Sequence, residues 1–156
     1  IFPVSFNLLL NLSSVCNADN SNDLWNYITN YAPELKKGLN KKFDMLVDLS
    51  INYYKDRVLP FKNFRLPSES ETKSIESLIN HLKDLNKEVS SEEIQSIVFK
   101  VGKENGYENL REWFSCLYET ALGQSSGPRI GGFIKLYGIN KTIKLLEDVL
   151  NGNLVK

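Results

Sequence analysis

The stretch SIESLINHLKDL, Ser74–Leu85, decides the fold class of this chain. Its apolar residues recur three or four positions apart, at Ile75, Leu78, Ile79, Leu82 and Leu85. Because an α-helix has about 3.6 residues per turn, residues at this spacing share one face. The stretch is therefore predicted to form an amphipathic helix that packs one side on a core and turns the other side to water.

The same spacing continues along most of the chain. It recurs in residues 24–31, 43–54, 94–101, 110–121 and 143–150. Ser90 followed by Glu93 is typical of a capping box, in which the two residues satisfy free amides at the start of a helix. No segment shows the sustained two-residue alternation of a half-buried strand. The sequence predicts an all-α fold, an irregular helical bundle of two small helical subdomains.

A proline-bounded segment divides the two predicted subdomains. Its sequence is LPFKNFRLP, Leu59–Pro67, and prolines at these positions prevent a continuous helix. We therefore expect a first subdomain over residues 1–59, a connector over 60–67 and a second subdomain over 68–156. The run SESE at 68–71 supplies helix-start residues for the second subdomain.

Composition limits the classes of protein to which the chain can belong. Its 156 residues, 42% of them hydrophobic, suit one globular domain or a pair of small ones. The net charge of +0 disfavours general coating of nucleic acid but allows a local basic patch. Cys16 and Cys116 stand far apart with no Cys/His cluster, so both are expected to be reduced, buried, intracellular thiols. His81, the single histidine, is expected on the polar side of its helix.

The motifs of enzymatic chemistry are absent from the sequence. No P-loop, HExxH, GxSxG or dinucleotide-binding fingerprint occurs, and no pair of carboxylates stands in an obvious catalytic setting. We therefore expect no catalytic residue, no metal site and no cofactor in this chain. On the residues alone, the chain is interpreted as a binding module.

The first residues form the apolar segment IFPVSFNLLLNL, Ile1–Leu12. It is too short to cross a bilayer, and it lacks the initial Met and basic residues of a signal peptide. We interpret it as a core helix, cut from a longer chain at its front end. Phe2, Phe6 and Leu9 are then expected to lack partners that an upstream domain supplies.

Residues 120–146 contain basic but no acidic side chains. The basic residues are Arg129, Lys135, Lys141 and Lys144, and the aromatic residues Tyr118, Phe133 and Tyr137 lie beside or among them. Cations suit phosphates, aromatic rings stack on unpaired bases, and a glycine-rich loop lets backbone amides approach a ligand. This combination suggests RNA binding. The alternative stays open that the lysines are a solvated face and that Phe133 belongs to the core.

The connector holds a second combination of basic and aromatic residues. Arg57, Lys62 and Arg65 are interleaved there with Phe61 and Phe64. They are either a further nucleic-acid contact, or two phenylalanines that fix the connector to the core while the charges face water.

Three stretches carry a more specific pattern, in a fixed order along the chain. They are FNLLLNLSSV at 6–15, YYKDRVLP at 53–60 and WFSCLYETALGQSSGPRIGGFIKLYG at 113–138. In the last, an aromatic-rich helix runs into leucine-glycine, then Gly-Pro-Arg, then an apolar segment that ends in glycine. Together the three stretches resemble the C-terminal helical part of class I lysyl-tRNA synthetases, and the resemblance covers nearly the whole chain. Glutamyl-tRNA synthetases share a looser form of the last stretch.

The resemblance implies a fragment of a lysine–tRNA ligase. The family's ATP-binding catalytic domain lies upstream, and its HIGH-like and KMSKS-like motifs are absent here, so the chain is expected to be inactive alone. It would comprise the end of the stem-contact region and the α-helix cage that reads the anticodon. The implied partners are tRNA(Lys) and the missing catalytic domain of the same polypeptide, in a cytoplasmic monomer with no membrane contact.

The pattern of basic and aromatic residues, taken together with the resemblance, gives the residues that are expected to touch tRNA. The candidates are Arg129, Lys135, Tyr137, Gln124, Lys141 and Lys144, with Lys62 and Arg65 of the connector. Two alternatives to this reading are the equivalent cage of a glutamyl-tRNA synthetase and a helical protein-interaction adaptor that binds no nucleic acid.

Overall fold

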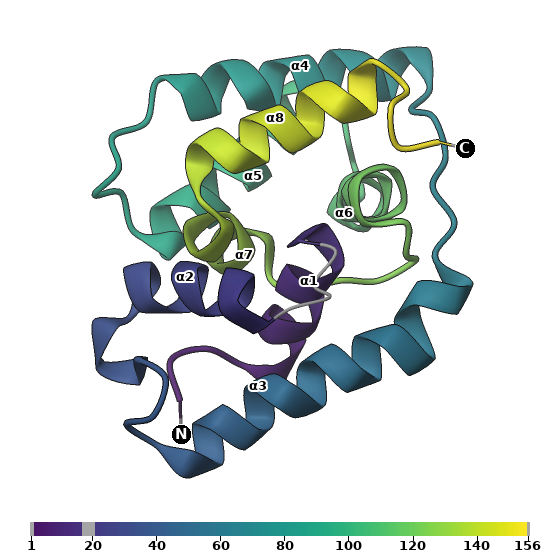
Figure 1. Ribbon diagram of the computed structural model, residues 1–156. Helices are drawn as coiled ribbons and strands as arrows, with labels where there is room; N and C mark the ends of the chain where they lie inside the picture. Colours follow the sequence, from purple (N-terminus) through teal and green to yellow (C-terminus); the bar gives the residue numbers. More distant parts are fainter. Residues whose placement is uncertain (1, 17–20, 156) are drawn as a thin grey trace. The chain divides into compact units, whose positions relative to one another are not determined.

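The computed structural model describes residues 2–16 and 21–155 of the chain, and these residues form helices and no strand (Figure 1). The predicted all-α fold is therefore confirmed for the described part of the chain. Its α-helices are α1 (Phe6–Cys16), α2 (Ser21–Tyr31), α3 (Lys41–Tyr53), α4 (Glu69–Lys83), α5 (Ser91–Glu104), α6 (Leu110–Leu117), α7 (Ile130–Tyr137) and α8 (Ile139–Leu150). Shorter turns are the 3₁₀ segments η1 (Pro33–Leu35) and η3 (Leu59–Phe61) and the π-helical segments η2 (Tyr54–Val58) and η4 (Tyr118–Leu122).

The chain divides into two compact units between Lys62 and Asn63. Unit 1 comprises Ile1–Lys62, and unit 2 comprises Asn63–Lys156. The division falls inside the segment 60–67, where the prolines predicted a connector.

Unit 1 is built on the packing of α1 against α3, with α2 beside both. Phe43 and Val47 of α3 and Leu12 of α1 are fully buried. The ring of Trp25 in α2 meets Phe43 edge-on, with centroids 5.8 Å apart, an arrangement that aromatic quadrupoles favour. Three helices thus share one small core.

The first residues of unit 1 have partners inside the unit, contrary to expectation. The Phe2 ring lies 4.9 Å from the Phe43 ring, and the Phe6 ring lies 5.8 Å from the Tyr53 ring. Leu9 is 0% exposed. The prediction that these residues lack partners in this chain is wrong, because α1 turns its apolar face to α3.

Unit 2 is organised by two helix pairs, α5 with α7 and α4 with α8. The second pair lies side by side in Figure 1. Trp113 of α6 is fully buried, and its indole Nε1 donates a hydrogen bond of 3.0 Å to the carbonyl of Val98 in α5. A Cβ at Gly102 would stand 2.7 Å from the Trp113 ring, so the glycine makes room for the indole.

The first turns of α4 and α5 are capped differently from the prediction. A complete capping box forms at α4, where the Ser68 side chain and the Glu71 side chain each satisfy the other residue's amide. At α5 the Ser90 hydroxyl accepts from the Glu93 amide, but it also donates to the Glu93 carboxylate. The Glu93 side chain is engaged there, so the predicted box at Ser90 is only half formed.

Two helices predicted as regular end in wide π-helical turns. The predicted helix over 43–54 becomes η2 from Tyr54, and the one over 110–121 becomes η4 from Tyr118. Wide turns of this kind correspond to one extra residue in an α-helix.

Single polar side chains largely follow expectation. His81 is partly exposed, and its Nδ1 lies 2.8 Å from the carbonyl of Ser77. Neither Cys16 nor Cys116 belongs to a disulfide, and Cys116 is buried as predicted. Cys16 is only half-buried, which corrects that prediction. Within residues 2–16 and 21–155, the helices are too short or too polar to cross a membrane.

Candidate nucleic-acid interface

The loop between η4 and α7 carries the predicted RNA contacts and is held on both sides. Gly123 takes a left-handed conformation, with φ of 70°, which a residue with a side chain adopts only at a cost. Its carbonyl accepts a hydrogen bond of 2.9 Å from the amide of Asn63. At the other end, the Tyr118 hydroxyl donates to the carbonyl of Pro128 at 2.8 Å. The loop is therefore anchored to η4 and to the connector.

Two glycines of this loop and of α7 serve close packing. A Cβ at Gly127 would run into the Tyr118 ring, and a Cβ at Gly131 would run into the backbone of Ser91 in α5. The amide of Gly131 donates a buried hydrogen bond of 2.6 Å to Oε1 of Gln95. This amide is already used inside the protein, so for these two glycines the structure favours packing over contact with RNA.

Three of the predicted cations are exposed. Arg129, Lys141 and Lys144 each reach solvent, and none forms an ion pair with the part of the chain that the structure describes. Arg129 precedes the first turn of α7, while Lys141 and Lys144 stand three residues apart on α8 and so on neighbouring turns. These are the predicted site residues whose charge is available to a ligand.

The other candidates in this region are more enclosed. Lys135 donates from Nζ to the carbonyl of Lys87 at 2.8 Å. Tyr137 is half-buried, and its ring lies 5.6 Å from that of Phe133, which is 3% exposed and belongs to the core. Gln124 is also half-buried, and its backbone amide donates a hydrogen bond of 3.2 Å to the carbonyl of Tyr118.

Lys62 lies at the end of unit 1 and is engaged there. Its Nζ stands 3.4 Å from the carbonyl of Ser14 and 3.4 Å from the hydroxyl of Tyr54. It also lies 5.4 Å from the centre of the Tyr54 ring, within the range of a cation–π contact. Among the cations of the connector, Lys62 therefore contributes to the packing of α1 against η2.

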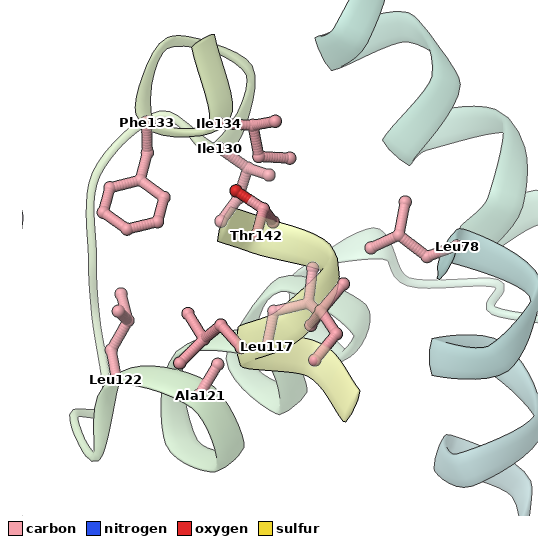
Figure 2. Close-up of a pocket in the computed structure, with 10 residues that line it drawn as sticks. Leu78, Leu117, Ala121, Leu122, Ile130, Phe133, Ile134 and Thr142 are labelled. Atoms are coloured by element: carbon pink, nitrogen blue, oxygen red, sulfur yellow. The ribbon is translucent and has the colours of Figure 1, made fainter. Parts of the chain in front are cut away.

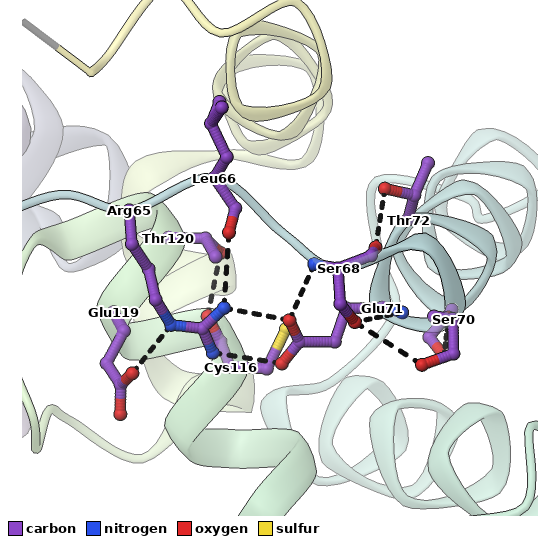
Figure 3. A network of polar contacts seen from close by, with 10 residues as sticks. Arg65, Leu66, Ser68, Ser70, Glu71, Thr72, Cys116, Glu119 and Thr120 are labelled. Carbon is purple, nitrogen blue, oxygen red and sulfur yellow. Dashed lines mark hydrogen bonds and ion pairs between the residues drawn. The ribbon is translucent and has the colours of Figure 1, made fainter.

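Arg65 ties the connector to two helical segments (Figure 3). Its Nε donates to Glu119 in η4 at 2.7 Å, and its two terminal nitrogens donate to the two oxygens of Glu71 in α4, at 2.8 and 2.9 Å. The fork-shaped pairing with Glu71 is the strongest geometry for this kind of ion pair. Arg65 thus uses its hydrogen-bonding capacity within unit 2.

The ion pair changes the proton affinity of the groups around it. Hydrogen bonds from Arg65 lower the pKa of Glu71 to about 2, and the amide of Ser68 adds to this effect. Cys116 lies beside the same carboxylate, and burial followed by the charge of Glu71 raises the pKa of its thiol to about 12. The thiol is therefore protonated and unreactive at neutral pH.

The connector also corrects the packing alternative drawn from its sequence. Phe61 is 78% exposed, so it does not fix the connector to the core. Phe64 does pack, because its ring lies where a Cβ on Gly123 would meet it at 3.1 Å. That alternative also expected the charges of the connector to face water, but Lys62 and Arg65 form polar contacts within the protein.

Glu71 and Glu119 were missed by reasoning from the sequence. A signal for Glu71 was present, because Ser68 and Glu71 have the spacing of a capping box. Glu119 lies 54 residues from Arg65, and no local pattern connects the two. Gln95 was missed for a similar reason, since its partner Gly131 is 36 residues away.

A small cavity inside unit 2 offers no second site. It has a volume of about 30 Å³ and is lined almost wholly by apolar side chains, among them Leu78, Leu117, Ala121, Ile130 and Ile134 (Figure 2). This is room for one or two waters, and the lining gives them few partners. The described residues also contain no group of three or more His, Cys, Asp or Glu that could hold a metal ion.

Comparison with known proteins shows to which proteins the sequence is related. No family model matches the chain. It is 42% identical over 149 residues to a lysine–tRNA ligase of Rickettsia bellii, and 42% identical over 152 residues to one of Roseobacter denitrificans. The chain is homologous to part of the lysine–tRNA ligases. The match to the Rickettsia bellii protein takes in 96% of this chain but spans only 28% of the relative's length, and for Roseobacter denitrificans the shares are 97% and 29%.

The comparison confirms the resemblance to lysyl-tRNA synthetases that the sequence suggested. A lysine–tRNA ligase of Rickettsia felis is 40% identical over the same share of the chain. Within the homologous part, Arg129, Lys141 and Lys144 are the exposed cations in the acid-free segment, whereas Lys62, Arg65 and Lys135 have partners in the protein.

Proposed function

We propose that this chain is the C-terminal tRNA-binding part of a class I lysine–tRNA ligase and that it reads the anticodon region of tRNA(Lys). The similarity to proteins named lysine–tRNA ligase, at 42% identity over 96% of the chain, is the observation that carries the proposal. The whole ligase would be a cytoplasmic monomer that uses ATP to attach lysine to tRNA(Lys). Activation of lysine would take place in an upstream domain, which is why the chain alone is expected to be inactive.

In the proposed contact, one arginine binds RNA with paired hydrogen bonds and two lysines bind it by charge. Arg129 is exposed at the start of α7, where its guanidinium can grip a phosphate or a base edge with two hydrogen bonds. Lys141 and Lys144 on α8 would pair with phosphates by charge alone. Because this segment carries no acidic residue, its field attracts RNA even though the whole chain has a net charge of +0.

The proposal is tested by electrophoretic shift with the 156-residue chain and tRNA(Lys), with tRNA(Glu) as competitor. We expect a shift with tRNA(Lys) that tRNA(Glu) does not compete away. Arg129→Ala should weaken binding by about 1–3 kcal/mol. The matched control is Arg111→Ala, because Arg111 is also exposed but lies on α6, outside the acid-free segment. Lys144→Ala should mainly flatten the dependence of affinity on salt, by about one unit of slope.

Each other outcome has a distinct meaning. Absence of any shift with tRNA would favour the protein-interaction adaptor. Competition by tRNA(Glu) at equal concentration would favour the glutamyl enzyme. If Arg129→Ala lowered the melting temperature and left affinity unchanged, Arg129 would serve the fold and the proposed contact would be wrong. Pyrophosphate exchange that depends on lysine, measured with the chain alone, would contradict the upstream location of catalysis.

A further inference from the structure

We propose that Tyr118 is a positioning residue for RNA binding, because its hydroxyl holds the backbone immediately before Arg129 and so fixes where the guanidinium meets tRNA. The inference rests on the proposed function, which assigns the RNA contact to Arg129. Tyr118 does not need to touch RNA, since it acts through its neighbour in space.

The loop before Arg129 has a composition that does not hold one shape by itself. Residues 123–127 read GQSSG, and stretches rich in glycine and serine behave as flexible linkers. Arg129 is exposed, and its side chain forms no ion pair within residues 2–16 and 21–155. A loop that becomes ordered only when RNA binds loses affinity through the entropy of ordering. Contacts that order the loop in advance therefore raise affinity.

Tyr118 holds this loop with three different parts of the residue. Its hydroxyl donates a hydrogen bond of 2.8 Å to the carbonyl of Pro128, the residue before Arg129. Its backbone carbonyl accepts a hydrogen bond of 3.2 Å from the backbone amide of Gln124. Its ring occupies the space that a Cβ on Gly127 would need. One residue thus contacts the loop near its start, in its second half and at its end.

The Tyr118 side chain is itself held in place. Its ring stacks on that of Phe114, four residues earlier, with centroids 6.5 Å apart and an angle of 27° between the planes. The side chain is half-buried, and burial raises the pKa of the hydroxyl above its ordinary value. The hydroxyl therefore keeps the proton that it donates to Pro128.

The backbone after Arg129 is fixed by contacts of a different kind. The amide of Gly131 donates its buried hydrogen bond of 2.6 Å to Gln95 of α5, which is 6% exposed. The carbonyl of Arg129 accepts a hydrogen bond of 3.0 Å from the amide of Phe133, in the first turn of α7. With this side already secured by the helix, the hydroxyl of Tyr118 supplies the restraint on the other side.

These contacts converge on one exposed cation between two enclosed residues. Pro128 is buried and Ile130 is 6% exposed, whereas Arg129 between them reaches solvent. The arginine side chain has several rotatable bonds, so the protein sets its reach mainly by fixing the backbone from which it starts. Paired hydrogen bonds to a phosphate or a base edge need that starting point to be constant.

A double-mutant cycle with Tyr118→Phe and Arg129→Ala tests the proposal. The affinity of the 156-residue chain for tRNA(Lys) is measured by electrophoretic shift, after circular dichroism has shown that each variant is folded at the assay temperature. Tyr118→Phe keeps the ring and removes the hydroxyl, and it should weaken binding about threefold to tenfold. In the Arg129→Ala background, the same change should alter the affinity less than about 1.5-fold, because the group that Tyr118 positions is gone.

Thr120→Val is the matched control, two residues along the same turn. Thr120 is 1% exposed, and its hydroxyl donates a hydrogen bond of 2.7 Å to the carbonyl of Cys116. That bond stays within the helical segment and does not reach the loop. Thr120→Val should lower the melting temperature and leave the affinity for tRNA(Lys) within about 1.5-fold. Equal losses of affinity in Thr120→Val and Tyr118→Phe would reveal a general effect on the fold and overturn the proposal.

A second cycle separates fixed geometry from charge. Arg129→Lys keeps the positive charge and removes the planar fork of the guanidinium. In the chain with Tyr118, this change should weaken binding about fivefold or more. In the Tyr118→Phe background it should have little further effect, because the fork is no longer held in its binding position. The same loss in both backgrounds would mean that Tyr118 does not position the guanidinium.

Failure of the inference can be told from failure of the proposed function. If the unchanged chain does not shift tRNA(Lys), or if Arg129→Ala leaves its affinity unchanged, the proposed contact is wrong and the inference falls with it. If Arg129→Ala weakens binding and Tyr118→Phe does not, the proposed function stands and positioning by Tyr118 is wrong. An equal loss from Tyr118→Phe in both Arg129 backgrounds would mean that the hydroxyl contributes independently of Arg129, which also overturns the proposal.

Discussion

The two units of the chain differ in how completely they cover their large apolar side chains. Unit 1, the shorter one, leaves Leu39, Met45, Leu49, Tyr53, Leu59 and Phe61 exposed, whereas the described part of unit 2 exposes Leu66 and Val155. Unit 2 closes its core with its own helices, so its stability should depend on internal packing. Unit 1 closes one side of α3 and leaves the other open. A unit that leaves apolar surface uncovered is expected to share that surface with another part of a larger molecule.

The largest effect is expected at the centre of the better-packed unit. Trp113→Ala removes a fully buried indole and its hydrogen bond to Val98, and should lower the free energy of unfolding by about 3–5 kcal/mol. Trp25→Ala is the matched change in unit 1, where the indole remains 6% exposed and the loss should be smaller. Urea titrations followed by circular dichroism measure both, and a larger loss at Trp25 would reverse the comparison.

A somewhat smaller effect is expected where two helices of unit 2 touch. Gly131→Ala forces a methyl group against Ser91 and strains the hydrogen bond to Gln95, so it should cost about 3 kcal/mol from overpacking and the weakened bond together. In unit 1, a Cβ at Gly38 would meet nothing within 4 Å, and only its φ of 92° opposes a side chain. Gly38→Ala should therefore cost about 1 kcal/mol. If thermal melts showed equal losses of stability for Gly131→Ala and Gly38→Ala, α5 and α7 would be able to move apart and accommodate the added methyl group at little cost.

The ion pair of unit 2 gives an acid-sensitive contribution. The pKa of Glu71 is lowered from 4.5 to about 2 by the hydrogen bonds from Arg65, so its contribution is complete above pH 4.5 and is lost as the pH falls toward 2. Because the Arg65 side chain is 40% exposed, we expect only about 1–2 kcal/mol. Glu71→Gln should lower stability by this amount at pH 7 and by much less near pH 2.

Glu69→Gln is the control for this change, because Glu69 stands in the same first turn of α4 and is exposed. Its effect on urea unfolding at pH 7 should be clearly smaller. A pH-independent loss in Glu71→Gln would show that the side chain acts through packing alone.

The smallest effect is expected on the uncovered side of unit 1. Leu49→Ser should change the unfolding free energy of the 156-residue chain by less than about 0.5 kcal/mol, because the side chain is 56% exposed. Leu66→Ser in unit 2 should behave alike. If the melting temperature fell markedly for Leu49→Ser alone, α3 would already be covered on this side within the chain, and the contrast between the units would disappear.

The fold class followed from the sequence because its signal is local. The spacing of Ile75, Leu78 and Ile79 predicts a helix without knowledge of what the helix packs on, and the prolines around Phe61 predict an interruption. The resemblance to lysyl-tRNA synthetases was also visible, because it rests on contiguous stretches of residues.

The roles of single cations were not predictable in the same way. Arg65 and Arg129 look alike in the sequence, but Arg65 meets Glu119 across 54 residues of chain, while Arg129 meets no acidic group among the described residues. Only the three-dimensional structure shows which basic residue already has a partner. The same limit applies to Gly131. Its backbone conformation is ordinary, and a side chain is excluded there only because α5 packs too closely against it.

The wide turn η4 has a consequence for where the basic segment points. Inserting one residue into an α-helix rotates everything after it by about 100° about the helix axis. Tyr118–Leu122 therefore sets the direction in which the chain leaves the helix at Gly123, against the ring of Phe64. Deleting a single residue within this turn would keep the helix continuous and swing the exit of the loop to a different side. The orientation of Arg129 is thus determined by the winding of the backbone as well as by the composition of its loop.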